Sequence, residues 1–293
     1  MKTIKLILSL FIVLLIIGFH GSDPVQAADI FVVKSNSIKP YDEALNGFKS
    51  LVKGRIKVYD LDNNPNNQIV AEIISEKPDL IYTIGSEATA LIGKNITKLP
   101  IVFSLVSNPE RLDLKNSNIS GVSINIPMPD QLYFLKQIIN KARRVGLLYS
   151  PVSIDKEDLT AAEASAQELG LDLIFQPIYL AQDVPSALRT LIDKIDVLWL
   201  MMDETALTEL AVKHIILTTT RHKIPILAFS PRYIHEGVLL ALKPDYYEMG
   251  IQAAELAIDI LNNQAAAGKI VPPRKLIPVI NTKAAKYFGL ELE

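Results

Sequence analysis

Short polar side chains follow several apolar runs of the sequence, at the point where each run stops. In LIYTIGSEATAL, Ser86 and Glu87 come directly after Gly85 and directly before a helix-forming run. The start of a helix offers unpaired N–H groups and a partial positive charge, so Ser86 beside it is suited to hold a carboxylate. Serine is also an ordinary helix N-cap, and the local sequence leaves both interpretations open.

This segment has a counterpart later in the chain. DLIYTIGSEATAL, from Asp79, resembles DVLWLMMDETAL, from Asp196, and the match aligns Ser86 with Asp203. KLPIVFS matches KIPILAF downstream, and DIFVVKS matches RVGLLYS upstream, in the same order. Three matches in register predict that the chain consists of two halves of similar design.

Each half alternates short apolar runs with helical patterns. The expected strands are 30–33, 56–59, 80–84 and 101–105 in the first half and 145–149, 173–177, 197–201 and 226–229 in the second, with one more at 275–280. The expected helices are 41–52, 69–75, 88–92, 158–169, 185–192, 205–218 and 246–260. Apolar strands alternating with helices are typical of parallel sheets covered on both faces. We therefore expect an α/β protein with two doubly wound parallel-sheet lobes and a cleft between them.

The stretch NISGVSINIPMPDQ joins the halves, and further elements follow the second half. If these elements return to complete each lobe, the chain crosses between the lobes three times. The predicted division is residues 28–123 plus 240–271 for the first lobe and 124–239 plus 272–293 for the second. Hinges are expected near 123–127, 236–240 and 271–273, where the lobes would rotate to close.

The N-terminal 27 residues are predicted to be a signal peptide. Lys2 and Lys5 precede an apolar run from residue 6 to 19 that is too short to span a bilayer comfortably. Small residues in VQAAD predict cleavage after Ala27 or Ala28. Because the chain of 293 residues contains no cysteine, it has no site for a lipid anchor, a disulfide or a thiolate metal site. We expect a free periplasmic protein.

Ligands of open α/β sheets bind beyond the carboxyl ends of the strands. That rule selects Ser35, Ser86, Glu87, Ser107 and Asn108 in the first lobe, and Tyr149, Ser150, Asp203, Thr205, Ser230 and Tyr233 in the second. A carboxylate at Ser86 and an ammonium group at Asp203 would suit an amino-acid-like solute. Tyr149 and Tyr233 are suited to stack on its side chain. The alternative for each residue is structural: capping, turn formation or packing.

Enzymatic function is not expected. The sequence lacks a G-x-S-x-G elbow and a phosphate-binding G-x-x-x-x-G-K loop. His214 and His222 are eight residues apart, which is too far for a shared metal on one helix. We therefore predict no catalytic residue, no metal and no cofactor, and a net charge of -2 gives no footprint for nucleic acid.

The strings KPDLIYTIGSEATA, PIVFSLVSNPE, NISGVS, RVGLLYSP and above all GVLLALKPDYYEMGIQAAELAIDIL resemble one family. It is the ABC-transporter substrate-binding family of the type I periplasmic binding protein fold, which has tryptophan- and phenylalanine-binding members. Asn108-Pro109 stands where the family usually has Asp-Pro. The resemblance implies a monomer that captures a small molecule, amino-acid-like or aromatic, and delivers it to an ABC permease. The alternative is a periplasmic sensor that presents its loaded form to a membrane kinase or chemoreceptor.

Overall fold

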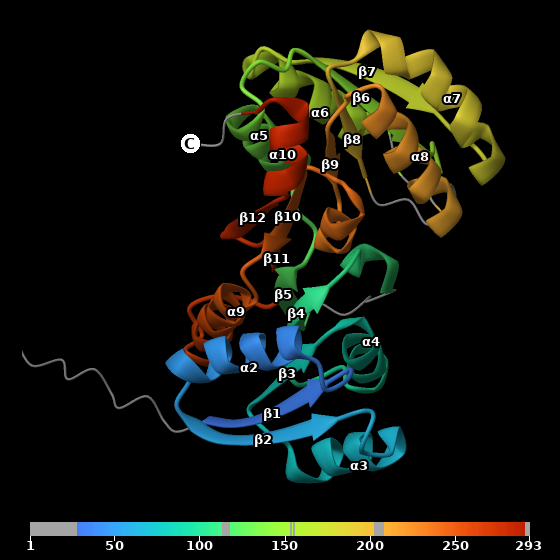
Figure 1. Ribbon diagram of the computed structural model, residues 1–293. Coiled ribbons are helices and arrows are strands. Elements are labelled where there is room, and N and C mark those ends of the chain that lie inside the picture. Colours follow the sequence, from blue (N-terminus) through green and yellow to red (C-terminus); the bar gives the residue numbers. More distant parts are fainter. Residues whose placement is uncertain (1–27, 113–117, 153, 155, 202–207, 291–293) are drawn as a thin grey trace, which may run out of the picture.

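The protein is described by a computed structural model, which consists of two lobes joined by crossing segments (Figure 1). The described residues are 28–112, 118–152, 154, 156–201 and 208–290. The predicted signal peptide and two candidate site residues, Asp203 and Thr205, lie outside them. None of the described helices is long and apolar enough to cross a membrane.

The first lobe is built on a six-stranded sheet of order β11-β5-β4-β3-β1-β2, in which every pair is parallel. Its strands are β1 (Ala28–Lys34), β2 (Gly54–Asp60), β3 (Leu80–Ile84), β4 (Ile101–Val106), β5 (Ile119–Ser123) and β11 (Ile270–Val271). Its helices are α2 (Lys39–Leu51), α3 (Asn66–Glu76), α4 (Ser86–Asn95), the 3-10 turn η1 (Pro109–Leu112) and α9 (Tyr246–Leu261). Since β3 and β4 are buried along their whole length, their continuous apolar sequence follows from cover on both faces.

The second lobe has a sheet of order β12-β10-β9-β8-β6-β7, in which only β12 runs antiparallel. Its strands are β6 (Arg144–Tyr149), β7 (Asp172–Pro177), β8 (Val197–Leu200), β9 (Ile226–Ala228), β10 (Leu240–Pro244) and β12 (Leu276–Ile280). Its helices are α5 (Met128–Ile138), α6 (Lys156–Glu168), α7 (Val184–Leu191), α8 (Glu209–Arg221) and α10 (Thr282–Phe288), with 3-10 turns η2 (Ala181–Asp183), η3 (Ile192–Lys194) and η4 (Pro231–Glu236). The predicted class, two parallel-sheet α/β lobes, is confirmed.

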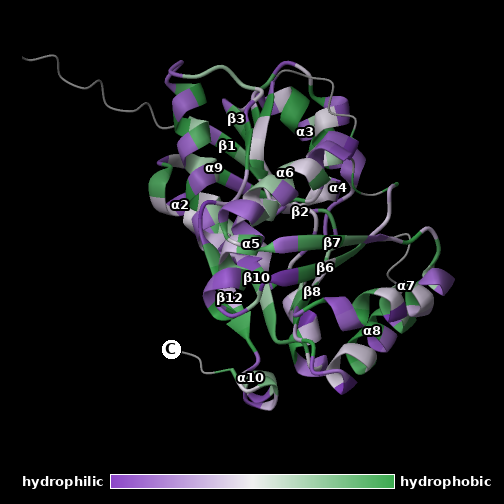
Figure 2. Cartoon of the chain, turned by 90° about the horizontal axis from the view of Figure 1, so that it is seen from above, coloured by the Kyte–Doolittle hydropathy of each residue, from purple (hydrophilic) through white to green (hydrophobic). Residues whose placement is uncertain are grey.

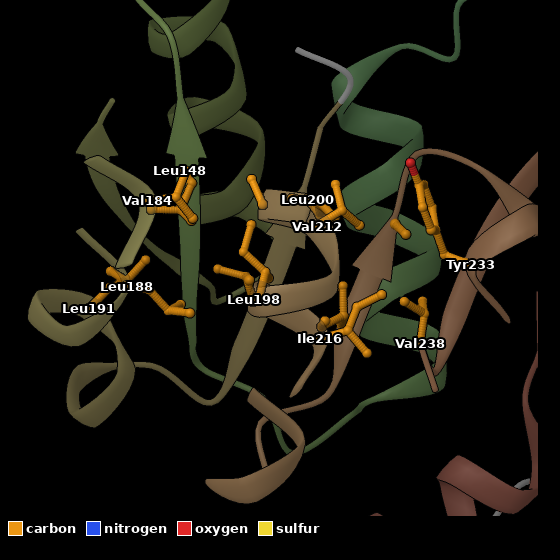
Figure 3. Packing of buried hydrophobic residues seen from close by; sticks show 14 of the residues in the cluster. Leu148, Val184, Leu188, Leu191, Leu198, Leu200, Val212, Ile216, Tyr233 and Val238 are labelled. Atoms are coloured by element: carbon orange, nitrogen blue, oxygen red, sulfur yellow. The ribbon is translucent and has the colours of Figure 1, made fainter. Parts of the chain in front are cut away.

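Apolar cores lie on both faces of each sheet. Figure 2 shows helices such as α2 and α8 carrying hydrophilic and hydrophobic stretches in alternation, as expected for helices that cover a sheet on one side. In the second lobe, α7 and α8 supply one such core together with β8, and Figure 3 shows Leu188, Leu198 and Val212 as three of its members.

The predicted sequence repeat corresponds to the same strand pairing in each lobe. At the start of β3, Asp79 N–H donates to Asp29 O at 2.8 Å, and Asp79 Oδ2 accepts from Asp29 N–H at 2.8 Å. At the start of β8, Asp196 N–H donates to Arg144 O at 2.8 Å, and Asp196 Oδ2 accepts from Arg144 N–H at 2.9 Å. The repeated aspartate therefore fixes the third strand of each lobe against the first.

The late helix α9 packs closely on α2, and glycines make the approach possible. A Cβ on Gly47 would lie 1.9 Å from Tyr247 O, and one on Gly250 would lie 1.9 Å from Ala44 O. Met249 and the alanines of α9 complete the core that contains β1. A segment near the end of the chain is thus part of the first lobe.

The structure corrects one predicted boundary. Residues 240–244 form β10, which pairs with β9 (Leu240 opposite Leu227) and with β12 (Leu240 opposite Ile280). They lie in the second lobe, whereas the predicted division at 239/240 placed them in the first. The second crossing therefore follows Pro244, and the hinge predicted at 236–240 is wrong because that stretch lies within the second lobe. The apolar run VLLAL was not recognised as a strand, since the helix after it dominated the pattern.

Three strands, two from the first lobe and one from the second, end on the same side of the molecule. In Figure 1 the arrowheads of β1 and β2 in one lobe and of β7 in the other point to the right. The polar residues that follow these strands are therefore gathered along one side.

Candidate ligand-binding site

The start of α4 is capped by a residue from another strand. Ala88 N–H donates to Ser35 Oγ at 2.9 Å, and Ser35 N–H donates to Ile84 O at 2.9 Å. Ser35 is buried where β1 ends, so its hydroxyl lies across the end of β3 at the helix N-terminus. This contact joins two neighbouring strand ends into one polar surface beside a helix dipole.

Gly85 allows this arrangement. It occupies the N-cap position of α4 with φ of 93° and ψ of 162°, a conformation that is essentially restricted to glycine. A Cβ there would lie 2.4 Å from the Tyr41 hydroxyl and 2.6 Å from Ser35 Oγ. Burial raises the pKa of Tyr41, the charge of Glu87 raises it further, and a hydrogen bond with Ser35 opposes both. Tyr41 therefore keeps its proton at neutral pH.

Ser86 is the first residue of α4 and not its cap, because Gly85 precedes it in that position. The interpretation of Ser86 as an ordinary N-cap is therefore wrong. Its side chain is half-buried, and within the described part of the chain its hydroxyl has no hydrogen-bond partner. Glu87 is exposed on the first turn. The Ser86 hydroxyl thus lies at the positive end of α4 without a structural task.

Ser107 and Asn108 follow β4 in an amide network. Asn125 Nδ2 donates to Asn108 Oδ1 at 2.8 Å, and Ser107 Oγ donates to Asn125 Oδ1 at 3.5 Å. Asn108 has φ of 46°, in the left-handed region that asparagine tolerates better than most residues. Both side chains are half-buried, so the predicted pair forms one polar edge with a residue that the sequence analysis missed.

In the second lobe, three candidate residues lie at the end of a strand or just beyond it. Tyr149 is half-buried with its ring edge-on to Phe175, at a centroid distance of 6.1 Å. Ser150 is buried and its Oγ accepts from Val152 N–H at 3.3 Å. Ser230 caps η4, where Arg232 N–H donates to its Oγ at 3.5 Å. The two serines therefore order their own loops, while Tyr149 presents part of a ring.

Tyr233 does not match its predicted role. It is 2% exposed and its ring packs edge-on to Phe229 at a centroid distance of 5.3 Å. Figure 3 shows the Tyr233 ring standing at one end of the core cluster. Arg232 lies over the same ring and donates to the hydroxyl. The ring belongs to the core and offers no face to a ligand in this conformation.

Two hollows of the described surface lie away from these residues. One of ≈ 430 Å³ lies between the starts of α7 and α8, beside Val184, Leu210 and His214. Another lies between α5 and the last crossing segment, beside Tyr133 and Pro272. Among the described residues, no group of three or more histidine, aspartate or glutamate side chains is placed to hold a metal ion.

Comparison with known proteins identifies the family. The family model of ABC transporter substrate binding proteins matches residues 46–293. The chain belongs to this family. A tyrosine-binding protein of Clostridioides difficile strain R20291 is 26% identical to this substrate-binding protein over 254 residues, which cover 83% of this chain and 72% of the other.

Solved structures of substrate-binding proteins share the fold. The ligand-free, open structure of a substrate binding protein with adhesive properties from Clostridium difficile has a TM-score of 0.72 at 22% identity, covering 91% of this chain and 96% of that one. An ABC domain in complex with L-Trp from Streptococcus pneumoniae has a TM-score of 0.56 at 18% identity, covering 92% and 96%. The predicted resemblance to this family is confirmed.

In this substrate-binding protein, Lys34 at the end of β1 is a further buried polar residue that was not predicted from the sequence. Its side chain is 7% exposed, and Nζ lies 2.7 Å from Asp42 Oδ1 and 3.1 Å from Asp60 Oδ1. Burial alone would lower the pKa of Lys34, but hydrogen bonds to Asp42 and Asp60 outweigh it and raise the pKa. The sequence does contain a signal for this ion-paired lysine, because Lys34 ends an apolar strand run and a lysine buried there requires acidic partners.

Proposed function

We propose that this substrate-binding protein captures an aromatic amino acid between its lobes outside the cytoplasm and delivers it to an ABC permease. Family membership supports binding of a small molecule, and the tyrosine-binding relative supports an aromatic amino acid. The absence of any recognised catalytic motif agrees with a binding role.

The N-terminus of α4 carries the proposal. Ser35 Oγ accepts the hydrogen bond from Ala88 N–H. The Ser86 hydroxyl and the first N–H groups of α4 therefore stay available to bind a carboxylate. A charge-assisted hydrogen bond there, with the helix dipole behind it, fixes the backbone end of an amino acid. Asn108 and the Tyr41 hydroxyl border the same side of the lobe.

The second lobe would supply the remaining contacts. We assign the ammonium group to Asp203, which the repeat aligns with Ser86, and the aromatic ring to Tyr149. Tyr149 is held edge-on by Phe175, so a ligand ring meets a rigid partner. Rotation about the crossing segments would bring these groups over a ligand held by the first lobe.

Thermal stability of residues 28–293 tests the proposal. L-tyrosine, L-tryptophan and L-phenylalanine are compared with L-leucine, with tyramine, which lacks the carboxylate, and with 3-(4-hydroxyphenyl)propionate, which lacks the ammonium group. A ligand at about a thousand times its dissociation constant stabilises by roughly 4 kcal/mol, a shift of several degrees. Stabilisation by an aromatic amino acid but not by tyramine is expected, and no shift with any aromatic amino acid contradicts the proposal.

Ser86→Ala separates ligand binding from folding. Because the hydroxyl has no hydrogen-bond partner among the described residues, the variant should keep the melting temperature of the ligand-free protein. Loss of a hydrogen bond to a charged group should weaken tyrosine binding about tenfold or more, measured by calorimetry. Ser37→Ala, an exposed serine of the neighbouring β1–α2 loop, is the matched control and should bind normally. Delivery is tested by uptake of labelled tyrosine in cells that lack the protein.

A further inference from the structure

The first crossing segment, residues 124–127, is held to the first lobe through its first half. Ile124 N–H donates to Val106 O at 2.9 Å, which extends the pairing of β5 with β4. The side-chain amide of Asn125 donates to Asn108 Oδ1 at 2.8 Å. Both bonds end on residues of the first lobe, so the chain as far as Asn125 moves with that lobe.

The next residue is held to the second lobe. Gln131, in the first turn of α5, donates from Nε2 to Ile126 O at 2.9 Å. Its Oε1 accepts from Trp199 Nε1 at 2.9 Å. Trp199 is fully buried in β8, and the Ile126 side chain packs against the same core. Gln131 thus connects the crossing segment to the centre of the second lobe.

We propose that Asn125 and Gln131 are positioning residues that confine lobe rotation to the peptide between Asn125 and Ile126. The hydrogen bond between Asn125 and Asn108 is the first-lobe anchor, and the hydrogen bond from Gln131 to Ile126 is the second-lobe anchor. Because the anchored residues, Asn125 and Ile126, are adjacent, the backbone torsions between them must absorb the rotation. The inference rests on the proposed closure of the lobes. Loss of either anchor would spread the rotation along the segment and admit more lobe orientations.

The last crossing has the same design. Gln252 of α9 donates from Nε2 to Pro272 O at 3.1 Å and accepts from Arg274 N–H at 2.9 Å. Two residues later, Leu276 is paired with Pro244 in the second sheet. Here too the chain passes from a first-lobe anchor to a second-lobe anchor within two residues, so the pivots of the crossings are short.

The first-lobe anchor also touches the candidate ligand-binding site. Asn108, which accepts from Asn125, and Ser107, which donates to it at 3.5 Å, are both predicted ligand contacts. A ligand that reorients either side chain acts directly on the residue beside the pivot. The structure therefore offers a short hydrogen-bonded connection from ligand contact to lobe rotation.

Inter-lobe distances in the ligand-free protein test the inference. Because the chain has no cysteine, Lys94→Cys on α4 and Arg189→Cys on α7 can carry a unique pair of spin labels. Gln131→Glu keeps an acceptor for Trp199 N–H but removes the donor to Ile126 O. Gln137→Glu makes the same chemical change at an exposed position of the same helix and is the matched control.

In Gln131→Glu, the distribution of distances between the two spin labels should be at least half as wide again as in the parent. In Gln137→Glu, it should match the parent. Asn125→Ala, which removes the other anchor, should broaden it in the same way and serves if Gln131→Glu does not fold. Distributions that match the parent in folded variants overturn the inference. Tyrosine affinity should fall about five- to tenfold with either anchor lost, the size of one hydrogen bond. If no amino acid binds, the proposed function fails while the ligand-free distances still decide the hinge.

Discussion

Replacing Gly85 by alanine tests whether the start of α4 is built as described. The new Cβ meets two obstacles: a backbone conformation that is essentially restricted to glycine, and the oxygens of Tyr41 and Ser35 at 2.4 and 2.6 Å. The conformation alone costs about 1–3 kcal/mol. Displacing Ser35 from Ala88 N–H adds about 1 kcal/mol, the usual cost of a lost helix cap. We therefore expect a destabilisation of about 2–4 kcal/mol.

The assay is urea unfolding followed by far-ultraviolet circular dichroism, because Trp199 lies in the other lobe and its fluorescence would miss the change. Gly170→Ala is the matched control. Gly170 has φ of 66° with no atom within 4 Å of an added Cβ, so it carries backbone strain without overlap. The free energy of unfolding of Gly170→Ala should fall by only about 1 kcal/mol.

Tyr41→Phe supplies the second arm of the experiment. It removes the oxygen nearest to the added Cβ, so Gly85→Ala should be less damaging in a Tyr41→Phe background than in the parent. A Gly85→Ala protein as stable as Gly170→Ala would refute the reasoning. An equal effect in both backgrounds would show that Tyr41 is not in contact with Gly85.

Three further outcomes are expected. Ser35→Ala should cost about 1 kcal/mol in urea unfolding through loss of the α4 cap, whereas Ser37→Ala should cost almost nothing. Lys34→Met should cost about 1–2 kcal/mol at pH 7. Since the folded-state pKa of Lys34 is raised, that deficit should shrink only as pH rises above about 10.4, and a constant deficit up to pH 12 would contradict the assignment. Burial raises the pKa of Asp196, but hydrogen bonds from Arg144 and Arg143 outweigh it and lower the pKa. The stability lost in Asp196→Asn should therefore be visible at pH 7 in thermal melts and should shrink progressively as pH falls below about 4.

Much of the fold was predictable because its strands are buried on both faces. Runs such as LIYTI and IVFSLV are mostly apolar and buried along their whole length, and β3 begins and ends where the sequence predicts. The strand β5 was not identified, since ISGVS is short and contains a glycine. Helix α8 begins at Glu209 with Thr208 as its cap, later than the predicted start at 205.

The candidate site was less predictable because its contacts join residues far apart in sequence. The cap of α4 comes from Ser35, 53 positions before Ala88, so local sequence suggested Ser86 for that task. Tyr233 follows a strand like the other candidates, but a 3-10 turn directs its ring into the core. Whether the predicted residues contact a ligand stays a prediction.

The packing of α9 on α2 has a consequence for the order of folding. Synthesis proceeds at about 5–20 residues per second, so roughly 200 residues and at least ten seconds separate the emergence of α2 from that of its partner. Through that interval the side of α2 that packs on α9, and the part of the core that Met249 and the alanines of α9 complete, have no cover. The first lobe, although most of it is encoded first, cannot be complete until α9 and β11 have emerged near the end of synthesis. A nascent chain therefore offers holding chaperones a long-lived hydrophobic target.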